Sequence, residues 1–362
     1  MMKDFSTKKV VIIGATGGLG KAISISLAGR NVNLYLIGRD ENKLDEVKNE
    51  VKCYTGNIVI SSKIKRDANF NDWEKIASTI QTEFEIPDII INAIGVDVRK
   101  SIQDQDDAEI ISQLDTNLKT PIYITKAFLP YFLTQNKGEL VHFSGFLDGR
   151  LAFPYYSVDV ATRAGLVSFI ESINREINNK SICIASYCPQ VADTESERPF
   201  HPIWKEMGIP ILTTEKIADD LIHTLGSSKT LRISGGFINS FFAKINSASP
   251  RLANLIIMNS YSEILRKNFG ITVVSSNKNS ILSKIGIFLI ILSFILYGFI
   301  FLVPFLPISL EVKGVTITGL IASGEVTFWI GLIFAGKEVY QSMKNKTKYY
   351  YKNIFKPKDT PK

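Results

Sequence analysis

Cysteine and histidine, the side chains that build disulfide frameworks and zinc sites, are scarce in this sequence. Only three cysteines and three histidines occur among 362 residues. Cys53, Cys183 and Cys188 include no C-x-x-C pair, and the histidines are scattered along the chain. We therefore predict neither a disulfide framework nor a metal site. So few cysteines are typical of a protein from a reducing compartment.

An excess of basic charge is also missing from most of the chain. Residues 1–280 carry 32 basic and 31 acidic side chains, whereas a nucleic-acid-binding surface needs a basic face. We therefore predict no nucleic-acid partner. The formal net charge of +7 comes almost entirely from residues 336–362, where eight lysines accompany only two acidic residues. Because this tail follows apolar segments, its charge favours anionic lipid head groups as a partner.

Short apolar runs alternate with helix-like segments over the first half of the chain. The strand candidates are 10–14, 32–38, 57–61, 88–95, 138–144 and 181–188, and the helix candidates are 18–29, 40–50, 71–84, 106–134 and 157–178. Continuous apolar runs indicate strands that are covered on both faces, so this order predicts an α/β fold with a doubly wound parallel sheet. Residues 196–275 are less regular and are expected to cover the carboxyl edge of the sheet. We place this α/β domain in residues 1–275 and a linker in 276–284.

Long uncharged stretches follow this domain. Residues 285–310 contain no charged side chain, which is long enough to cross a hydrocarbon core; a buried helix of a soluble protein is the alternative. Residues 315–335 form a second segment with Glu325 at its centre. Because a carboxylate is costly in lipid, Glu325 is expected to be protonated, paired or turned toward the partner helix. An interfacial helix that starts near Glu325 is the competing interpretation of this segment.

Two crossings would form a transmembrane hairpin over residues 285–336. The basic excess beyond the second segment then predicts, by the positive-inside rule, that the tail over 337–362 lies in the cytoplasm. A hairpin returns the chain to the side from which it came, so the N-terminal domain is predicted to be cytoplasmic as well.

A glycine-rich turn follows the first predicted strand. The sequence VVIIGATGGLGKAI places Gly14, Gly18 and Gly20 between that strand and the first predicted helix. Glycines at such a junction let the backbone approach a pyrophosphate, which the free N–H groups and the dipole of the helix N-terminus attract. The turn therefore indicates a dinucleotide site, and a purely structural glycine turn is the alternative.

The end of the second predicted strand bears on the choice of dinucleotide. NAD-binding proteins usually have an acidic residue there, which holds the ribose 2′-hydroxyl. This sequence has Gly38 followed by Arg39, and a guanidinium suits a 2′-phosphate. We therefore predict NADP as the cofactor. The alternative is that Arg39 is a surface arginine paired with Asp40 or Glu41.

These motifs make residues 8–240 resemble the short-chain dehydrogenase/reductase family, which implies a Rossmann-like fold. Asp67-Ala68 falls where the family contacts adenine, residues 92–95 resemble the family's N-N-A-G, and residues 189–194 (PQVADT) resemble P-G-x-V-x-T beside the nicotinamide. The cofactor site that the residues and the resemblance imply consists of Gly14, Thr16, Gly17, Gly18, Leu19, Gly20, Arg39, Asp67, Ala68, Asn92, Ala93, Gly95, Pro189 and Thr194.

The resemblance also implies a catalytic set of Ser, Tyr and Lys, the last two spaced Y-x-x-x-K. In the family Tyr donates a proton to the carbonyl oxygen, Lys lowers the pKa of Tyr, Ser binds the substrate oxygen and a mid-helix Asn supports a proton relay. Ser144 and Asn117 match two of these positions. The ungapped register that starts at Pro154 places Asp159 in the Tyr position and Arg163 in the Lys position.

This departure from the family pattern leaves three interpretations open. An aspartate of ordinary pKa, about 3.9, is an anion at neutral pH and cannot donate the proton. Asp159 and Arg163 could then be a simple i,i+4 salt bridge on an exposed helix face, worth about 0.3–0.5 kcal/mol, with the usual chemistry lost. Alternatively, Tyr156 could supply the proton from the same face with Arg163 lowering its pKa, or Tyr155 and Tyr156 could form an aromatic wall for an apolar substrate.

The C-terminal pieces LVPFLP, GEVTFWIG and GKEVY are similar to a two-helix bacterial hairpin called the transporter suffix domain. This resemblance implies a multi-pass anchor in a bacterial inner membrane. We predict a membrane-tethered, NADP-dependent oxidoreductase that acts on a ketone or alcohol of an apolar or lipid-like small molecule. The alternative is a non-catalytic NADP-binding sensor or partner subunit. The lipid bilayer is the expected partner, and assembly into a homo-oligomer stays open.

Overall fold

The computed structural model describes residues 5–270 and 280–354. The chain divides into two compact units, one formed by Met1–Ala253 with Ile264–Ile271 and the other by Asn254–Glu263 with Thr272–Lys362. The predicted linker over 276–284 begins outside the described residues, and the last residues of the predicted tail, 355–362, also lie outside them. The boundaries of the predicted domains stay predictions.

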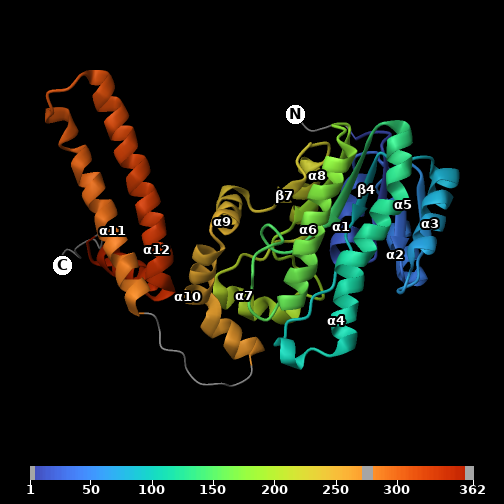
Figure 1. Cartoon of the computed structure of the whole chain (residues 1–362), viewed down its shortest axis with the longest axis horizontal. Helices are drawn as coiled ribbons and strands as arrows, with labels where there is room; N and C mark the ends of the chain where they lie inside the picture. Colours follow the sequence, from blue (N-terminus) through green and yellow to red (C-terminus); the bar gives the residue numbers. More distant parts are fainter. Residues whose placement is uncertain (1–4, 271–279, 355–362) are drawn as a thin grey trace, which may run out of the picture. The chain divides into compact units, whose positions relative to one another are not determined.

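A seven-stranded parallel sheet forms the centre of the first unit, as predicted (Figure 1). Its order is β3-β2-β1-β4-β5-β6-β7. The strands are β1 (Lys9–Ile13), β2 (Asn33–Gly38), β3 (Val59–Lys63), β4 (Ile89–Asn92), β5 (Gly138–Phe143), β6 (Ile182–Cys188) and β7 (Leu231–Ile233). The last of these has no counterpart among the predicted strands. After β1 the chain adds β2 and β3 on one side of that strand, and it then adds β4 and the later strands on the other side. A crevice for ligands lies at the carboxyl ends of the strands where the order reverses in this way.

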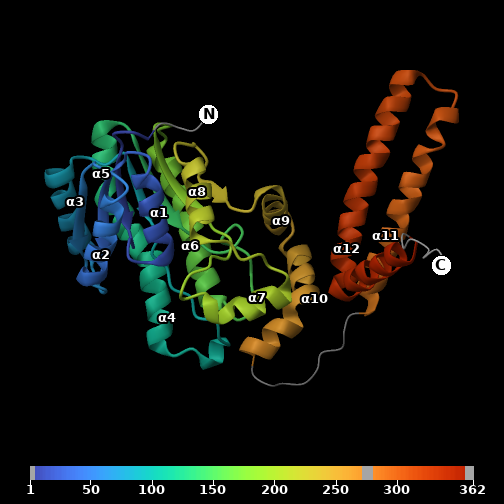
Figure 2. The same ribbon diagram turned by 180° about the vertical axis from the view of Figure 1, so that it is seen from behind.

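Helices cover both faces of the sheet, which is why its central strands β1 and β2 are largely apolar and buried (Figures 1 and 2). Helices α1 (Gly18–Ala28), α2 (Glu41–Lys52) and α8 (Thr214–Thr224) pack on one face through residues such as Leu27 and Leu221. Helices α3 (Phe70–Phe84), α5 (Thr120–Gln135) and α6 (Ser157–Ile177) pack on the other through Phe128 and Leu166. Both apolar layers are fully removed from water, which is the main stabilising term of the fold.

The single helix predicted over 106–134 is divided in the structure. It consists of α4 (Asp107–Leu114), a π-helical turn (Asp115–Lys119) and α5. The ring of Pro121 has no N–H to donate to the carbonyl of Asn117, so the ordinary i→i−4 ladder cannot continue through this point. The wider turn places the Asn117 side chain inside the protein, where it is 1% exposed. Turns of this kind are frequent at functional sites.

The less regular region after β6 contains helices that the sequence did not resolve. Besides α8 they are α7 (His201–Met207), α9 (Gly236–Ala248) and α10 (Pro250–Phe269). Helix α7 and the loop before it supply part of a cavity at the carboxyl edge of the sheet. For the rest of residues 196–275, covering of that edge stays a prediction.

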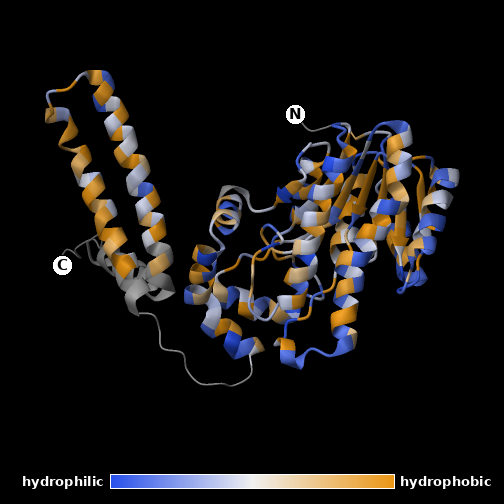
Figure 3. Cartoon of the chain, viewed as in Figure 1, coloured by the Kyte–Doolittle hydropathy of each residue, from blue (hydrophilic) through white to orange (hydrophobic). Residues whose placement is uncertain are grey.

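The second unit includes the helices α11 (Ser280–Ile300) and α12 (Leu310–Ile354), which pack against each other. Within the described residues one segment, Ile285–Phe305, is long and apolar enough to cross a membrane by length and composition. Figure 3 shows that the visible part of α11 is more apolar than that of α12. Glycines, hydroxyl side chains and Glu325 interrupt the apolar sequence of the predicted second crossing over 315–335.

Candidate functional site

The turn between β1 and α1 is a backbone cradle that only glycine fits. Gly14 has φ of +84°, a left-handed conformation that favours glycine. A Cβ at Gly20 would overlap the carbonyl oxygen of Gly14, and a Cβ at Gly18 would lie 2.9 Å from Cγ2 of Thr194. Gly17 begins α1 without a side-chain cap, so the first N–H groups of the helix remain available to a ligand. The turn over residues 14–20 therefore packs against the loop after β6, where Gly18 lies next to Thr194.

Arg39 is free to contact a ligand at the end of β2. The residue is exposed and forms no ion pair with any described residue. Asp40 instead accepts a backbone N–H of α2 at 3.1 Å, and Glu41 pairs with a lysine of β3 at 3.5 Å. The pairing of Arg39 with either acid, weighed as the alternative, is therefore not formed. Asp67 is exposed and Ala68 is buried in the turn that follows β3.

The side chain of Asn92 shapes the end of β4. Its Nδ2 donates to Nδ1 of His142 at 3.0 Å, and its Oδ1 accepts the N–H of Ile94 at 3.3 Å. The hydroxyl of Thr125 donates to a backbone carbonyl and therefore accepts from Nε2 of His142 at 2.9 Å. Burial without a charged partner lowers the pKa of His142 to about 3, so the ring is neutral. Asn92 thus positions residues 92–95 through its side chain, and Ala93 and Gly95 lie in that turn.

We expect His142 to make stability depend on pH below neutrality. The unfolded ring has a pKa of about 6.5, whereas the folded ring stays neutral down to about 3. The unfolded state therefore binds one more proton in this window, and the free energy of unfolding should fall by about 1.4 kcal/mol per pH unit as the pH drops below 6. Urea unfolding of the full chain at several pH values measures this slope. A His142→Gln variant should lose that part of the slope, and an unchanged slope would contradict the assignment.

Asp159 and Arg163 form a buried pair, not the exposed one considered from the sequence. Both residues are 8% exposed. Oδ1 of Asp159 accepts Nε of Arg163 at 3.1 Å and Nδ2 of Asn117 at 3.1 Å. Burial raises the pKa of Asp159 above its ordinary value despite the opposing charge of Arg163. Because a buried pair loses its hydration, the value of about 0.3–0.5 kcal/mol for exposed pairs does not apply to it.

Arg163 occupies space that two glycines leave free. A Cβ at Gly95 would lie 2.8 Å from its Nη2, and a Cβ at Gly145 would lie 3.0 Å from its Cγ. Its Nη1 donates to the carbonyl of Phe143 at 3.1 Å. Arg163 therefore links the ends of β4 and β5 to α6, and its charge is held against Asp159.

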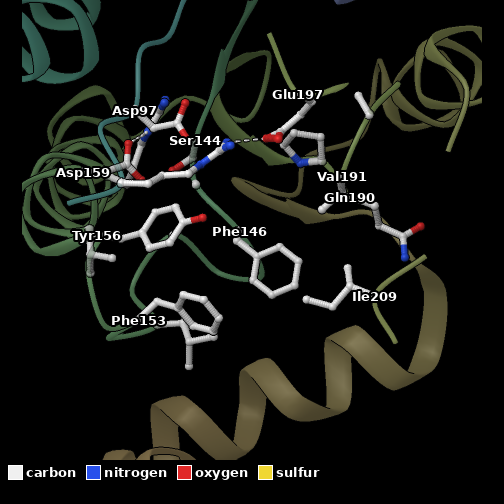
Figure 4. Close-up of a pocket in the computed structure, with 18 of the residues that line it drawn as sticks. Asp97, Ser144, Phe146, Phe153, Tyr156, Asp159, Gln190, Val191, Glu197 and Ile209 are labelled. Carbon is white, nitrogen blue, oxygen red and sulfur yellow. Dashed lines mark hydrogen bonds and ion pairs between the residues drawn. The ribbon is translucent and has the colours of Figure 1, made fainter. Parts of the chain in front are cut away.

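Ser144 and Tyr156 present buried hydroxyls to the cavity. They are 5% and 9% exposed. Ser144 interacts with the buried thiol of Cys188, whereas the hydroxyl of Tyr156 has no hydrogen-bond partner among the described residues. Tyr156 immediately precedes α6, and Figure 4 shows its hydroxyl pointing into the cavity. Burial raises the pKa of Tyr156 far above its ordinary value, so the phenol stays protonated. This corrects the expectation that Arg163 lowers that pKa.

The cavity has a volume of about 250 Å³ and lies at the carboxyl edge of the sheet. The predicted residues Leu19, Ser144, Asp159, Arg163, Pro189 and Thr194 line it together with Tyr156. Its apolar wall is made of Phe146, Leu151, Phe153, Val160, Val191, Trp204 and Ile209. Tyr156 packs edge-on against Phe153 with ring centroids 5.4 Å apart, so it belongs to this aromatic wall as well. Tyr155 does not line the cavity, and its backbone has a φ of +68°.

Three charged residues of the cavity were not predicted from the sequence. Arg99, in the loop after β4, pairs with Asp97 at 2.5 Å and with Glu197 in the loop after β6. Its guanidinium carbon lies 3.9 Å from the ring centroid of Phe200, and Trp204 donates its indole N–H to Glu197 at 3.2 Å. These residues lie in loops without a recognisable spacing, so no motif singled them out.

The doubly wound sheet, the glycine turn at α1 and the cavity at the carboxyl edge define an α/β protein of the class that binds its ligands at this edge. Residues 8–202 match the family described as short chain dehydrogenase. This chain belongs to the short-chain dehydrogenase family. An uncharacterized oxidoreductase of Staphylococcus epidermidis is 26% identical over 193 residues, which are 53% of this chain and 81% of the relative. One from Staphylococcus aureus is 24% identical over 233 residues, which are 64% of this chain and 97% of the relative.

Solved structures share the fold of this chain. L-sorbose reductase from Gluconobacter frateurii, complexed with NADPH and L-sorbose, has a TM-score of 0.58 at 17% identity, over 65% of this chain and 98% of that protein. A short chain dehydrogenase from Burkholderia cenocepacia in complex with NADP has a TM-score of 0.57 at 19% identity, over 69% and 96% of the two chains. These similarities establish the architecture of the first unit.

Proposed function

We propose that this protein is an NADP-dependent oxidoreductase that reduces a ketone, or oxidises the corresponding alcohol, in an apolar or lipid-like small molecule. The observation that carries the proposal is the buried hydroxyl of Tyr156, which has no partner among the described residues and faces an apolar cavity that Ser144 also lines. A buried hydroxyl without a partner is unfavourable, and a carbonyl oxygen in the cavity would satisfy it. Oxidoreductase relatives and the NADP complexes of structural neighbours support the same reaction class.

The residues present fit an NADP molecule. A Cβ at Gly20 would fill the cradle, the first turn of α1 offers free N–H groups, and Arg39 is available for a 2′-phosphate. When bound, NADPH would supply the hydride. Ser144 and Tyr156 would hold the carbonyl oxygen, and the protonated phenol of Tyr156 would donate the proton. Asn117 and Arg163 would keep the Asp159 carboxylate away from that oxygen.

We expect the full chain to bind NADPH more tightly than NADH. Gly38 offers no carboxylate to repel a 2′-phosphate, and the unpaired guanidinium of Arg39 can bind it. Arg39→Ala should remove most of this preference, about tenfold or more in Kd for NADPH, with little change for NADH. Isothermal titration of both nucleotides measures the two constants. Arg175→Ala, an exposed arginine of α6, is the control, and equal affinities in the unaltered protein would contradict the prediction.

A second candidate function is binding of NADP without catalysis, as a sensor or partner subunit. The closed pair of Asp159 and Arg163 favours it, because this pair occupies the positions where the family usually has Tyr and Lys. The two functions differ in a single assay. The purified full chain is supplied with NADPH and a series of apolar ketones, and formation of the alcohol is measured. Alcohol formation supports the enzyme, whereas NADPH binding without product supports the sensor.

We further propose that α11 and α12 anchor the protein in a bacterial inner membrane as a hairpin. The apolar segment Ile285–Phe305 supports the first crossing. For the second, the costly carboxylate of Glu325 accepts the hydroxyl of Tyr297 at 2.9 Å and the indole N–H of Trp329 at 3.0 Å. Pairing across the two helices is one of the arrangements that makes a carboxyl group tolerable in lipid.

Protease accessibility in sealed membrane vesicles tests this topology. If the chain crosses twice, the first unit and the lysine-rich tail should be cleaved from the same side, the cytoplasmic one. A cytoplasmic protein and a periplasmic protein of known location serve as controls for vesicle sealing. Cleavage of the two ends from opposite sides would exclude the hairpin and would mean that one helix does not cross.

A further inference from the structure

The charged side chains of the cavity carry a net negative charge. Asp97, Asp159 and Glu197 line it together with only two basic residues, Arg99 and Arg163. The side chain of Arg99 is 7% exposed, and those of Asp159 and Arg163 are 11% and 10% exposed. The side chain of Glu197 is 19% exposed and that of Asp97 is 37% exposed. Water therefore screens the charges of Arg99, Asp159, Arg163 and Glu197 less than it would on the surface, and it screens Asp97 more than these. A ligand in the cavity meets three carboxylates and two guanidinium groups.

Arg99 is not arranged as a receptor for an anion. Its Nη2 pairs with both Asp97 and Glu197. A guanidinium binds a carboxylate with two hydrogen bonds through Nε and Nη2 or through Nη1 and Nη2. Both arrangements need Nη2, which is already occupied in Arg99. Among the described residues Nε and Nη1 of Arg99 have no partner, but they lie on different edges of the guanidinium and cannot bind one carboxylate together. The face of the group lies over the ring of Phe200. Arg99 therefore balances one of its two carboxylate neighbours and leaves the other uncompensated.

We propose that the Asp97–Arg99–Glu197 cluster makes this cavity select uncharged carbonyl compounds and reject anionic ones. The proposal rests on the proposed function and specifies its substrate class. The apolar wall favours a hydrocarbon chain, and the hydroxyl of Tyr156, which has no partner among the described residues, favours a carbonyl oxygen. A carboxylate or phosphate on that chain would be desolvated beside a cavity with excess negative charge. Ketones, aldehydes and neutral esters fit these requirements, whereas keto acids and acyl phosphates do not.

A matched pair of ligands isolates the charge. Methyl 7-oxooctanoate and 7-oxooctanoate have the same chain and the same ketone, and they differ only in the charge of the terminal group. Their Kd values for the full chain are measured at pH 7 by calorimetry without cofactor, so the readout does not depend on turnover. Because an ester is intrinsically more apolar than an acid, the quantity compared between variants is the ratio of the two Kd values.

Substitutions that keep shape but remove charge should change this ratio. Glu197→Gln still accepts the indole N–H of Trp204, and we expect it to improve the relative affinity for the acid about tenfold. Adding Asp97→Asn should improve it about tenfold again. Glu176→Gln, an exposed site of α6 outside the cavity, is the control and should leave the ratio unchanged.

Two results would overturn the proposal. One is an unaltered protein that binds the acid as tightly as the ester, or a ratio that stays constant in the double variant. The other is a failure of both ligands to bind, which would mean that the cavity is not the substrate site. The proposed function fails separately, when no ketone of any charge is reduced in the NADPH assay.

Discussion

Replacing Tyr156 with Phe is expected to lower NADPH-dependent ketone reduction by about 10²–10⁴-fold while cofactor affinity stays the same. The variant removes the one hydroxyl of the aromatic wall that is buried, unpartnered and directed into the cavity. Burial raises its pKa, so the group carries a proton at every physiological pH and can give it to a carbonyl oxygen. Steady-state rates and NADPH titrations of the purified full chain measure the two effects separately.

Tyr155→Phe is the matched control, because the neighbouring phenol does not line the cavity. Its rate should stay within about threefold of the unaltered protein, as expected for a change outside the site. Asp159→Asn tests the other possibility, that the Asp159 carboxyl group donates the proton. Turnover that survives Tyr156→Phe but disappears in Asp159→Asn would mean that the carboxyl group, whose pKa is raised by burial, carries the proton itself.

Arg163→Met is expected to destabilise the first unit by about 3–5 kcal/mol at pH 7, because it leaves the buried Asp159 carboxylate without its cation. The loss should shrink as the pH falls toward 4. A protonated Asp159 needs no cation, and a carboxyl whose folded pKa is raised gains stability on acidification. Chemical unfolding at pH 7 and at pH 4.5 measures both values.

A double variant and a surface control complete this test. Asp159→Asn combined with Arg163→Met removes both charges and should recover much of the lost stability, which a double-mutant cycle quantifies. Arg150→Met breaks a half-exposed ion pair with Glu171 and should cost less than about 1 kcal/mol. A loss in Arg163→Met no larger than that of the control would show that the buried pair does not stabilise the fold.

The features that the sequence predicted are those set by local pattern. Apolar runs identified six of the seven strands because buried parallel strands need no alternation. β7 was not predicted because it has three residues and a charged one, Arg232, at its centre. In the structure Arg232 is buried and pairs with Glu139 at 2.6 Å. The division of the long helix is explained by Pro121, which lies in the middle of the predicted segment 106–134 and removes a backbone donor there, so this break could have been predicted from the sequence.

The site was predictable only in part. The spacing of Asp159 and Arg163 predicts that they meet, but spacing does not show which face of α6 is buried. That face is decided by packing against Asn117, Gly95 and Gly145, which come from distant parts of the chain. The cluster around Arg99 depends in the same way on two loops that the fold brings together. Contacts of this kind leave no periodic signal in a single sequence.

The proposed function requires that this site reduces a carbonyl group. A single-turnover reaction of the full chain with an apolar ketone and NADPH deuterated at C4 of the nicotinamide tests it most directly, with the alcohol analysed by mass spectrometry. We expect one deuterium in the alcohol formed by the unaltered protein and almost none in the reaction of Tyr156→Phe under the same conditions. Saturable binding of NADPH without labelled alcohol from any apolar ketone would contradict it and would favour the non-catalytic alternative.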